Sequence, residues 1–356
     1  MKTPTKRVNM TSDGLALSPA EYADLLVELA QSGKLNKDDY GHGGSVEEFE
    51  RAMANELGKE AAVVMPTGTM ANLLAIEYLA GRKRKVVVQQ ESHMFNDCGD
   101  CGPGLANLQL TALGKGATFS KADVQSVIDR ADRGKVAAPL GVVSVETPVR
   151  RLDGEMFDIA ALDEVVQLAR ANNVRLHLDG ARLPVVAACS GRSMCEIAAP
   201  FDTVYVSLYK CFNSLSGAII AGDKKGMEQL RQWRRRNGGG MAQLWPIAAV
   251  AHHYLDNVVG KLEEAFAISK SFFALLEQDN RFEIQPVLNG SSVFRIVLSG
   301  ADQKKTASFR EHLETLSVFL PAADAGTARF TIKVNASWRR SNGEAIFSAF
   351  RQAADQ

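Results

Sequence analysis

The sequence lacks an excess of charge of either sign, long apolar runs and an even set of cysteines. Its 356 residues include 41 Lys and Arg against 41 Asp and Glu, so no overall basicity indicates binding to nucleic acid or an anionic membrane. No apolar stretch is long enough to span a bilayer, and the polar start MKTPTKRVNMTSDG has no secretory apolar segment. Five cysteines in a long chain argue against a disulfide framework, so we expect a cytoplasmic protein.

Motifs that mark metal centres or nucleotide-binding folds are also missing. Cys98 and Cys101 form a C-x-x-C sequence without a second pair or a histidine at ligand spacing. We therefore interpret them as two thiols in a Gly-rich loop and expect no metal. No G-x-G-x-x-G follows a predicted strand, and no G-x-x-x-x-G-K-[ST] occurs.

The sequence does contain short apolar runs that alternate with helical patterns. The runs fall at 61–65, 85–89, 141–146, 174–179, 203–208 and 217–222. Such strands with intervening helices predict an α/β fold, with a mostly parallel sheet covered on both faces. A long helical stretch to about residue 278, three strand-like runs and two more helices then predict a smaller α+β module. We expect an N-terminal arm at 1–40, a large domain at 41–250 and a small domain at 251–356.

One lysine lies in an unusual setting. Lys210, in VYVSLYKCFNSLSGAIIAG, stands between an apolar run and a second strand-like segment. An ammonium group there is poorly hydrated, so it needs either an acidic partner or a chemical use for its neutral amine. A lysine with a lowered pKa is nucleophilic and forms imines with carbonyl groups.

Other candidate groups follow predicted strands at the same rim of the sheet. Asp179, in HLDGARL, ends one strand, and Gly68 and Thr69 open a helix whose free N–H groups and dipole suit a phosphate. Taken alone, Asp179 and the Gly68–Thr69 pair are each typical of an ordinary helix cap. Together, an anion cradle, a buried acid and a dehydrated lysine are what pyridoxal 5′-phosphate needs for its phosphate, ring nitrogen and aldehyde. We expect Lys210 to hold this cofactor through an imine.

The combination of motifs resembles a known family. MPTGTMANLLAI, HLDGARL, the strand leading to Lys210 and NGGGMAQ are similar, in order and approximate spacing, to the threonine aldolase branch of the fold-type-I pyridoxal-phosphate enzymes. The broader grouping includes the aromatic amino acid β-eliminating lyases. The resemblance implies the aspartate aminotransferase type of fold, an amino-acid substrate, and a homo-oligomer (dimer or tetramer) with shared active sites.

The resemblance also implies roles for individual positions. His93 would stack on the pyridine ring, Asp179 would pair with the ring nitrogen, and Arg235 would reach the phosphate of a neighbouring subunit. The implied cofactor-binding set is Gly68, Thr69, His93, Asp179, Arg182, Ser207, Lys210 and Arg235. The implied substrate-binding set is Ser12, Tyr40, Arg182 and Arg329, in which arginine suits the α-carboxylate because its guanidinium binds in a bidentate way.

The chain departs from the family pattern in three places. Val149, in ETPVR, replaces the histidine of the common E-N-T-H-N, a group thought to handle the β-hydroxyl proton. His42, in GHGGS, is the candidate replacement. Ala242 stands where the family has an arginine near the phosphate, so Arg235 would carry more of that task. The context YKCFNSLSGAI differs from S-K-G-L-x-A-P-V-G, which suggests a subgroup with its own substrate.

The expected function is cleavage of the Cα–Cβ bond of a β-hydroxy-α-amino acid, such as threonine, allo-threonine or phenylserine, to glycine and an aldehyde. The catalytic set would be Lys210, His93, Asp179 and His42. Two alternatives stay open. One is β-elimination or transamination of another amino acid with the same cofactor, and the other is a non-catalytic binding protein that keeps the fold.

Overall fold

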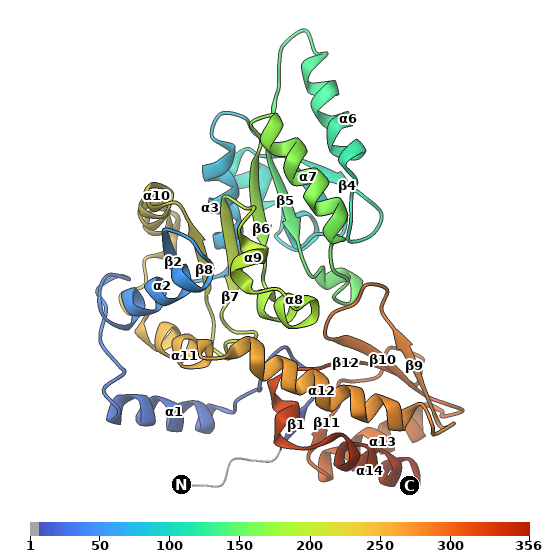
Figure 1. Ribbon diagram of the computed structural model, residues 1–356. Helices are drawn as coiled ribbons and strands as arrows, with labels where there is room; N and C mark the ends of the chain where they lie inside the picture. Colours follow the sequence, from blue (N-terminus) through green and yellow to red (C-terminus); the bar gives the residue numbers. More distant parts are fainter. Residues whose placement is uncertain (1–6) are drawn as a thin grey trace.

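The computed structural model describes residues 7–356 and is built around a seven-stranded sheet (Figure 1). The strand order is β2-β8-β7-β6-β5-β3-β4. Strand β8 runs antiparallel to both neighbours, whereas the other adjacent pairs are parallel. The carboxyl ends of β3, β5, β6 and β7 therefore meet at one edge of the sheet. The strands are β2 (Ala61–Met65), β3 (Lys85–Gln89), β4 (Gln109–Leu113), β5 (Leu140–Glu146), β6 (Arg175–Asp179), β7 (Thr203–Ser207) and β8 (Ala218–Gly222).

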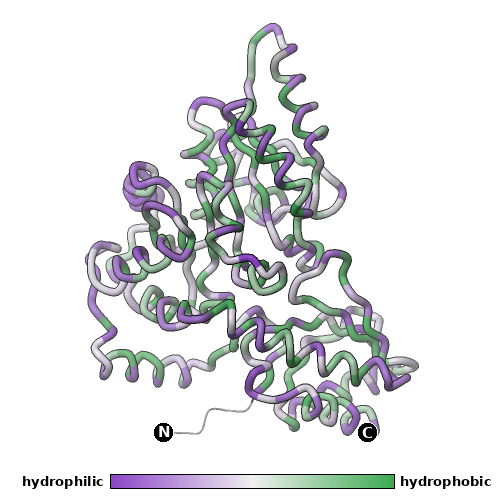
Figure 2. The backbone as a smooth tube through the Cα atoms, viewed as in Figure 1, coloured by the Kyte–Doolittle hydropathy of each residue, from purple (hydrophilic) through white to green (hydrophobic). Residues whose placement is uncertain are grey.

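Alternate residues of these strands enter cores on opposite faces of the sheet. Val143 and Val145 of β5 belong to the larger core, whereas Val142 faces the other side. Figure 2 shows apolar residues concentrated along the central strands. The larger core is covered by α2 (Gly44–Glu56), α6 (Lys121–Asp132), α7 (Ile159–Ala171), α8 (Leu183–Ser190), α9 (Met194–Ala198) and α11 (Trp245–Leu255). The other face is covered by α3 (Gly68–Ala80), α4 (His93–Asn96), α5 (Cys101–Ala106) and α10 (Lys224–Arg234). The predicted α/β fold is confirmed.

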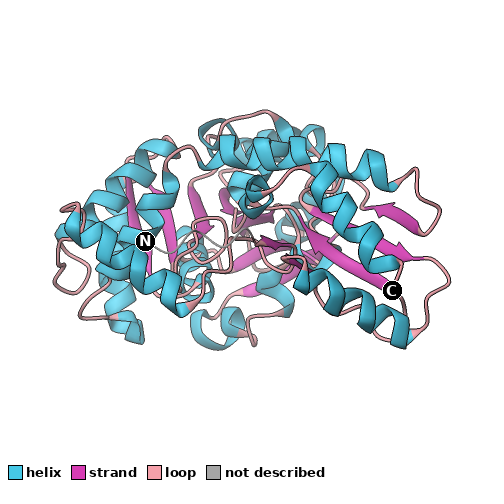
Figure 3. Cartoon of the chain, turned by 90° about the horizontal axis from the view of Figure 1, so that it is seen from below, coloured by secondary structure: helices cyan, strands magenta, loops and turns pink. Residues whose placement is uncertain are grey.

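A smaller α+β domain follows the large one in the chain. Its antiparallel sheet has the order β12-β10-β9, and Figure 3 shows it packed with helices beside the large sheet. Aromatic rings fill its core; the ring of Phe272 lies 4.9 Å from that of Phe350 and 5.5 Å from that of Trp338. The elements are β9 (Phe282–Pro286), β10 (Val293–Leu298), β12 (Arg329–Lys333), α13 (Gln303–Thr315), α14 (Gly343–Ala354) and the 3₁₀ helix η3 (Ala336–Arg340).

The N-terminal segment belongs to both domains. Strand β1 (Val8–Asn9) pairs in parallel with β11 (Val318–Phe319), and Met10 joins the aromatic core of the small domain. Helix α1 (Pro19–Gln31) instead packs against α11 of the large domain. The arm expected at 1–40 is thus divided between the two domains, and its residues 1–6 lie outside the described part.

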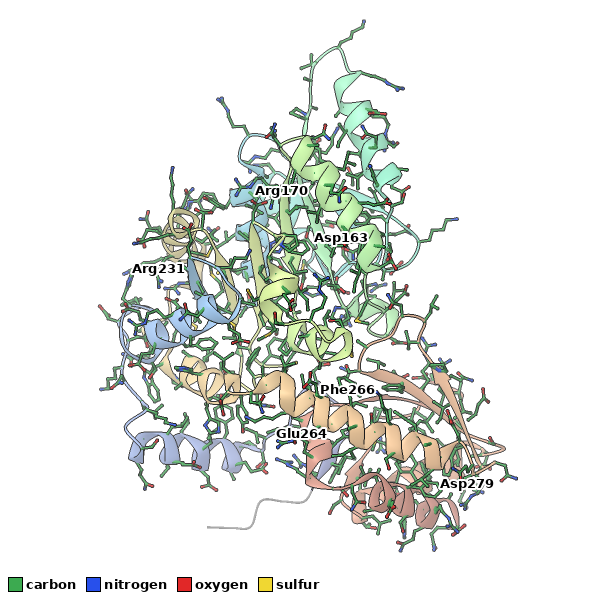
Figure 4. The ribbon with its side chains drawn as sticks, viewed as in Figure 1. Asp163, Arg170, Arg231, Glu264, Phe266 and Asp279 are labelled. Carbon is green, nitrogen blue, oxygen red and sulfur yellow. The ribbon has the colours of Figure 1, made fainter. Side chains whose placement is uncertain are left out.

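The long helical stretch expected at the start of the small domain is two helices. It breaks before α12 (Val258–Leu276), at Asn257, whose φ of 49° lies in the left-handed region that Asn tolerates. Helix α12 begins in the core of the large domain, with Leu262, and ends in that of the small one. Phe266, in the middle of α12, contacts both cores (Figure 4). No helix within residues 7–356, α12 included, has the length and apolar character needed to cross a membrane.

Candidate active site

A cleft of about 460 Å³ lies at the carboxyl-terminal edge of the large sheet. Residues that follow β3, β5, β6 and β7 line it, together with the start of α3. Of the predicted site residues, the cleft brings together Gly68, Thr69, His93, Asp179, Arg182 and Lys210. It also includes charged and aromatic residues that the motifs did not predict: Asp13, Glu146, Arg150, Tyr205 and Tyr209. A larger hollow of about 960 Å³, lined by α1, α11 and the far side of the Lys210 loop, contains none of the predicted six.

Lys210 is buried in the loop between β7 and β8, where it is 9% exposed. Burial, with Arg182 nearby, lowers the pKa of Lys210 to about 8. The N–H of Asn213 donates to the Lys210 carbonyl oxygen at 3.1 Å. Gly14 packs against this loop so closely that a Cβ there would lie 2.6 Å from the same oxygen, and the Leu15 N–H donates to Asn213 Oδ1 at 2.6 Å. The loop therefore holds an amine that becomes neutral close to physiological pH.

Asp179, at the end of β6, is held by a buried chain of hydrogen bonds. Asn72 donates from Nδ2 to Asp179 Oδ2 at 2.7 Å, and Asn72 Oδ1 lies 3.0 Å from His177 Nε2. His177 Nδ1 lies 2.8 Å from Thr203 Oγ1. Burial lowers the pKa of His177 to about 3, so this imidazole is neutral, and its Nε2 carries the proton that Asn72 accepts. Burial also raises the pKa of Asp179, which suits a carboxylate that awaits a cationic partner.

Three charged groups from distant segments form a cluster beside the cleft. Arg182 donates from Nε and Nη2 to the two oxygens of Asp13, both at 2.9 Å. Lys333 Nζ lies 3.1 Å from Asp13 Oδ1. Burial alone would raise the pKa of Asp13, but Arg182 and then Lys333 lower it, so Asp13 is ionised. Two cations share one carboxylate, and the cluster therefore keeps a positive charge for a ligand carboxylate.

Glu146, the last residue of β5, positions the opposite wall of the cleft. Its Oε2 accepts the His93 N–H at 2.5 Å, and its Oε1 accepts the Arg150 N–H at 3.0 Å. Burial, with Asp179 nearby, raises the pKa of Glu146 to about 7. The His93 ring is held separately, with Nδ1 at 3.4 Å from Asp97 Oδ2. Glu146 thus fixes the backbone beneath both His93 and Arg150.

The start of α3 forms an anion-binding surface. The Met70 N–H donates to the capping Thr67 hydroxyl at 3.2 Å. The N–H groups of Gly68 and Thr69 lie in the first turn, where a helix offers them no partner of its own. A Cβ on Gly68 would lie 2.2 Å from the Tyr205 hydroxyl oxygen, so only glycine keeps this space open.

Ser207 is not part of this surface. Its hydroxyl is fully buried, has no hydrogen-bond partner among the described residues and does not line the cleft. The predicted contact between Ser207 and the cofactor therefore stays a prediction, since Ser207 is not among the residues that line the cleft.

Two predicted substrate contacts lie elsewhere. Arg329 begins β12 and pairs with Asp324, at 2.5 Å, away from the residues that line the cleft. The cation of that strand that contacts a residue of the cleft is Lys333, four residues later on the same face, through Asp13. The Ser12 hydroxyl is used within the N-terminal turn, where Asn9 Nδ2 donates to it at 2.6 Å.

Tyr40, His42 and Arg235 lie together in a different hollow, of about 500 Å³. The Arg235 guanidinium stacks over the Tyr40 ring, 4.4 Å from its centroid. Arg235 begins one π-helical turn (Arg235–Gly239) after α10. None of the three lines the cleft that contains Lys210. The structure thus does not bring His42 to the lysine of its own chain, and the prediction that it serves there as a base is not supported within one subunit.

The Val149 position contributes no proton acceptor. Val149 is fully buried, and its N–H donates to the Glu155 carbonyl oxygen at 2.8 Å. The chain enters the cleft one residue later, at Arg150. His93 is therefore the imidazole that this cleft provides.

These residues fit pyridoxal 5′-phosphate. The start of α3, kept open at Gly68, would hold the phosphate, Asp179 would hold the ring nitrogen and Lys210 would hold the aldehyde. A protonated ring nitrogen is the cation that the buried Asp179 carboxylate needs. Within residues 7–356, no group of three or more His, Cys, Asp and Glu side chains is arranged to hold a metal.

Comparison with known proteins agrees with this geometry. A model of the β-eliminating lyase family matches residues 26–290. The chain is 28% identical to a low-specificity L-threonine aldolase of Candida albicans over 256 residues, which cover 69% of this chain and 66% of that protein. It is 27% identical to a probable low-specificity L-threonine aldolase 2 of Arabidopsis thaliana over 289 residues, or 80% of this chain and 79% of that protein. Its fold is similar to the crystal structure of a candidate L-allo-threonine aldolase from Listeria monocytogenes, with a TM-score of 0.78 and 26% identity over 99% of this chain and 96% of that one.

Proposed function

The chain belongs to the β-eliminating lyase family, and from this premise we propose that it is a pyridoxal-phosphate-dependent aldolase. It cleaves the Cα–Cβ bond of a β-hydroxy-α-amino acid of the threonine type, and the products are glycine and an aldehyde. The observation that carries the proposal is the Lys210 amine, with a pKa of about 8, in one cleft with Asp179 and the Arg182–Asp13 ion pair.

The substrate is oriented by its α-carboxylate. We assign this group to Arg182 and Lys333, because the two cations share Asp13 and keep a net positive charge. Arg182 lines the cleft together with Lys210, so a carboxylate bound there directs the substrate amine towards the lysine.

Each remaining group has one task. When bound, pyridoxal phosphate supplies a ring that accepts the electron pair released as the Cα–Cβ bond breaks. Asp179, held by Asn72, keeps a carboxylate beside that ring. His93 lines the cleft with its Nδ1 facing Asp97, and we assign to its imidazole the uptake of the β-hydroxyl proton. Lys210 returns a proton to Cα as glycine forms.

β-Elimination is the second candidate, and one feature favours it. Val149 is buried at the position for which the family resemblance implies a histidine, so the proton acceptor for the β-hydroxyl group is left to His93. Loss of a β-leaving group needs no such acceptor, and it would release ammonia and a keto acid in place of glycine.

Product identity tests the proposal. The purified holoenzyme should release glycine and an aldehyde from threonine, allo-threonine or phenylserine, and Lys210→Ala should abolish this release. Lys225→Ala, which changes an exposed lysine of α10, is the matched control and should retain it. Borohydride reduction followed by peptide mapping should place the pyridoxyl group on Lys210. Ammonia and a keto acid as the products, or glycine release that survives Lys210→Ala, would refute the proposal.

The proposal includes a homo-oligomer, dimer or tetramer, with sites built from two subunits. It is supported by Tyr40, His42 and Arg235, which form a cationic and aromatic surface outside the cleft of their own chain. Lys210→Ala and Arg235→Ala should each be inactive alone and regain activity when co-refolded, because a hybrid contains one site with both native residues. A monomer by light scattering, or an inactive hybrid, would contradict this part. All five cysteines are free, which fits the cytoplasmic location that we also propose.

A further inference from the structure

One cation of the cleft has no task in this mechanism. Arg150 opens the 3₁₀ helix η1 (Arg150–Leu152) after β5 and lines the same cleft as Lys210. Its backbone N–H donates to Glu146 Oε1 at 3.0 Å, and its Nη2 donates to Asp97 Oδ2 at 2.6 Å. Arg150 is therefore tied to Glu146 through its backbone N–H and to Asp97 through its guanidinium, and its side chain, 48% exposed, remains open to a ligand.

Arg150 lies away from the phosphate-binding surface. Gly68 follows β2, Asp179 ends β6 and Arg150 follows β5, and the sheet order is β2-β8-β7-β6-β5. The Asp179 position thus separates Arg150 from the start of α3. Arg150 is therefore on the side of the cleft away from the strand that leads into the phosphate-binding helix start.

Arg150 is also separate from the cations assigned to the α-carboxylate. Arg182 and Lys333 share Asp13, whereas Arg150 shares Asp97 with Arg151. Among the described residues, the Arg150 side chain forms its hydrogen bond through Nη2 with Asp97. The remaining N–H groups of the guanidinium are left to bind a second carboxylate in the bidentate geometry that arginine favours.

We propose that Arg150 binds a carboxylate on the substrate side chain, so that the preferred substrates are β-hydroxy-α-amino acids with an anionic side chain. The smallest such compound is 3-hydroxyaspartate. This inference rests on the proposed function. In the reaction the Cα–Cβ bond breaks, the β-hydroxyl group loses its proton and becomes the aldehyde of glyoxylate, and Cα gains a proton to give glycine, so all atoms are accounted for. The methyl group of threonine would leave Arg150 paired with Asp97 alone.

The first experiment compares kcat/KM for 3-hydroxyaspartate and threonine, with glycine measured as the product of both. The holoenzyme should favour 3-hydroxyaspartate about 10- to 100-fold, the range for a hydrogen bond between charged groups. Arg150→Met should bring this ratio to roughly one, and Arg150→Lys, which keeps the charge without the bidentate geometry, should give an intermediate value. Arg151→Gln, which changes the neighbouring exposed arginine that does not line the cleft, should keep the ratio of the native chain.

A binding measurement separates recognition from turnover. L-Aspartate and L-2-aminobutyrate lack the β-hydroxyl group, so neither can undergo the aldol cleavage, and titration calorimetry gives their affinities for the holoenzyme. Arg150→Met should weaken the binding of aspartate about tenfold more than it weakens the binding of aminobutyrate.

The outcomes distinguish this inference from the proposed function. A native ratio at or below one, or a ratio that Arg150→Met leaves unchanged, overturns the role of Arg150, while glycine release from threonine keeps the proposed function. Conversely, Arg150-dependent conversion of 3-hydroxyaspartate to oxaloacetate and ammonia would support side-chain recognition by Arg150 and overturn the aldol reaction.

Discussion

Lys333→Met should impair substrate binding, whereas Arg329→Met should leave it nearly intact. The two residues lie four positions apart on strand β12 and on the same face, so the variants are closely matched. Lys333 Nζ contacts Asp13 Oδ1 at 3.1 Å, whereas Arg329 pairs with Asp324. The comparison decides which cation of the small domain meets the α-carboxylate.

The expected magnitude follows from exposure. The Lys333 side chain is 26% exposed and that of Asp13 is 11% exposed, so this contact is shielded from water. Loss of a charged hydrogen bond in such a setting costs about 1.5–3 kcal/mol, or about 10- to 100-fold in binding. The Arg329–Asp324 pair is more exposed, at 41% and 33%, and a surface pair contributes about 0–1 kcal/mol. Loss of Lys333 also leaves Arg182 as the only cation paired with Asp13, so Arg182 is less available to bind the substrate α-carboxylate.

Steady-state kinetics with threonine measures the effect. Lys333→Met should raise KM about 10- to 100-fold with a smaller change in kcat, because the lost contact binds substrate and transition state alike. Thermal unfolding of both variants controls for damage to the small domain. If Arg329→Met raises KM at least tenfold and Lys333→Met does not, the assignment of the α-carboxylate to Lys333 is wrong.

Other perturbations address Lys210 and the buried network below Asp179. Uptake of pyridoxal phosphate by the apoprotein should accelerate as pH rises through about 8, because the neutral amine of Lys210 is the reacting form; a rate independent of pH in stopped-flow absorbance would contradict this. Asn72→Leu removes the donor to Asp179 and the acceptor for His177, so urea titration should show a free energy of unfolding lower by about 2–4 kcal/mol, and a loss below about 1 kcal/mol would count against the network. Burial lowers the pKa of His177 from 6.5 to about 3, so the unfolded chain takes up the proton first. This histidine therefore contributes a fall in the free energy of unfolding between pH 6.5 and about 3, with a slope of up to about 1.4 kcal/mol per pH unit that His177→Gln should reduce; equal slopes in the two proteins would argue against a neutral His177.

The central groups of the site could be predicted because strand ends define the rim of a parallel sheet. Lys210, Asp179 and Gly68 each follow an apolar run, and the structure places all three in one cleft. Their chemical types then indicate the cofactor without any knowledge of distances. The strands themselves were predictable because a sheet covered on both faces needs continuous apolar residues, as in β5, where every residue is buried.

The groups that position the site could not be predicted in this way. Asn72 lies inside the apolar helix α3, and its contact with Asp179 depends on how that helix crosses the sheet. The contact of Lys333 with Asp13, where Arg329 instead pairs with Asp324, depends on where β12 ends relative to Asp13, which no local pattern encodes. Glu146 ends a predicted strand as Asp179 does, so the same strand-end signal could have identified it.

The N-terminal segment carries a further consequence. Within eight residues it supplies Val8 and Met10 to the core of the small domain, Asp13 to the ion pairs with Arg182 and Lys333, and Gly14 and Leu15 to the loop that holds Lys210. The position of the small domain and the orientation of the Lys210 loop are therefore coupled through one short segment of backbone. Proteolytic removal of residues up to 15 would therefore inactivate the protein even if the large sheet stayed folded. A tag fused directly to that segment would likewise lower the catalytic activity of the purified protein.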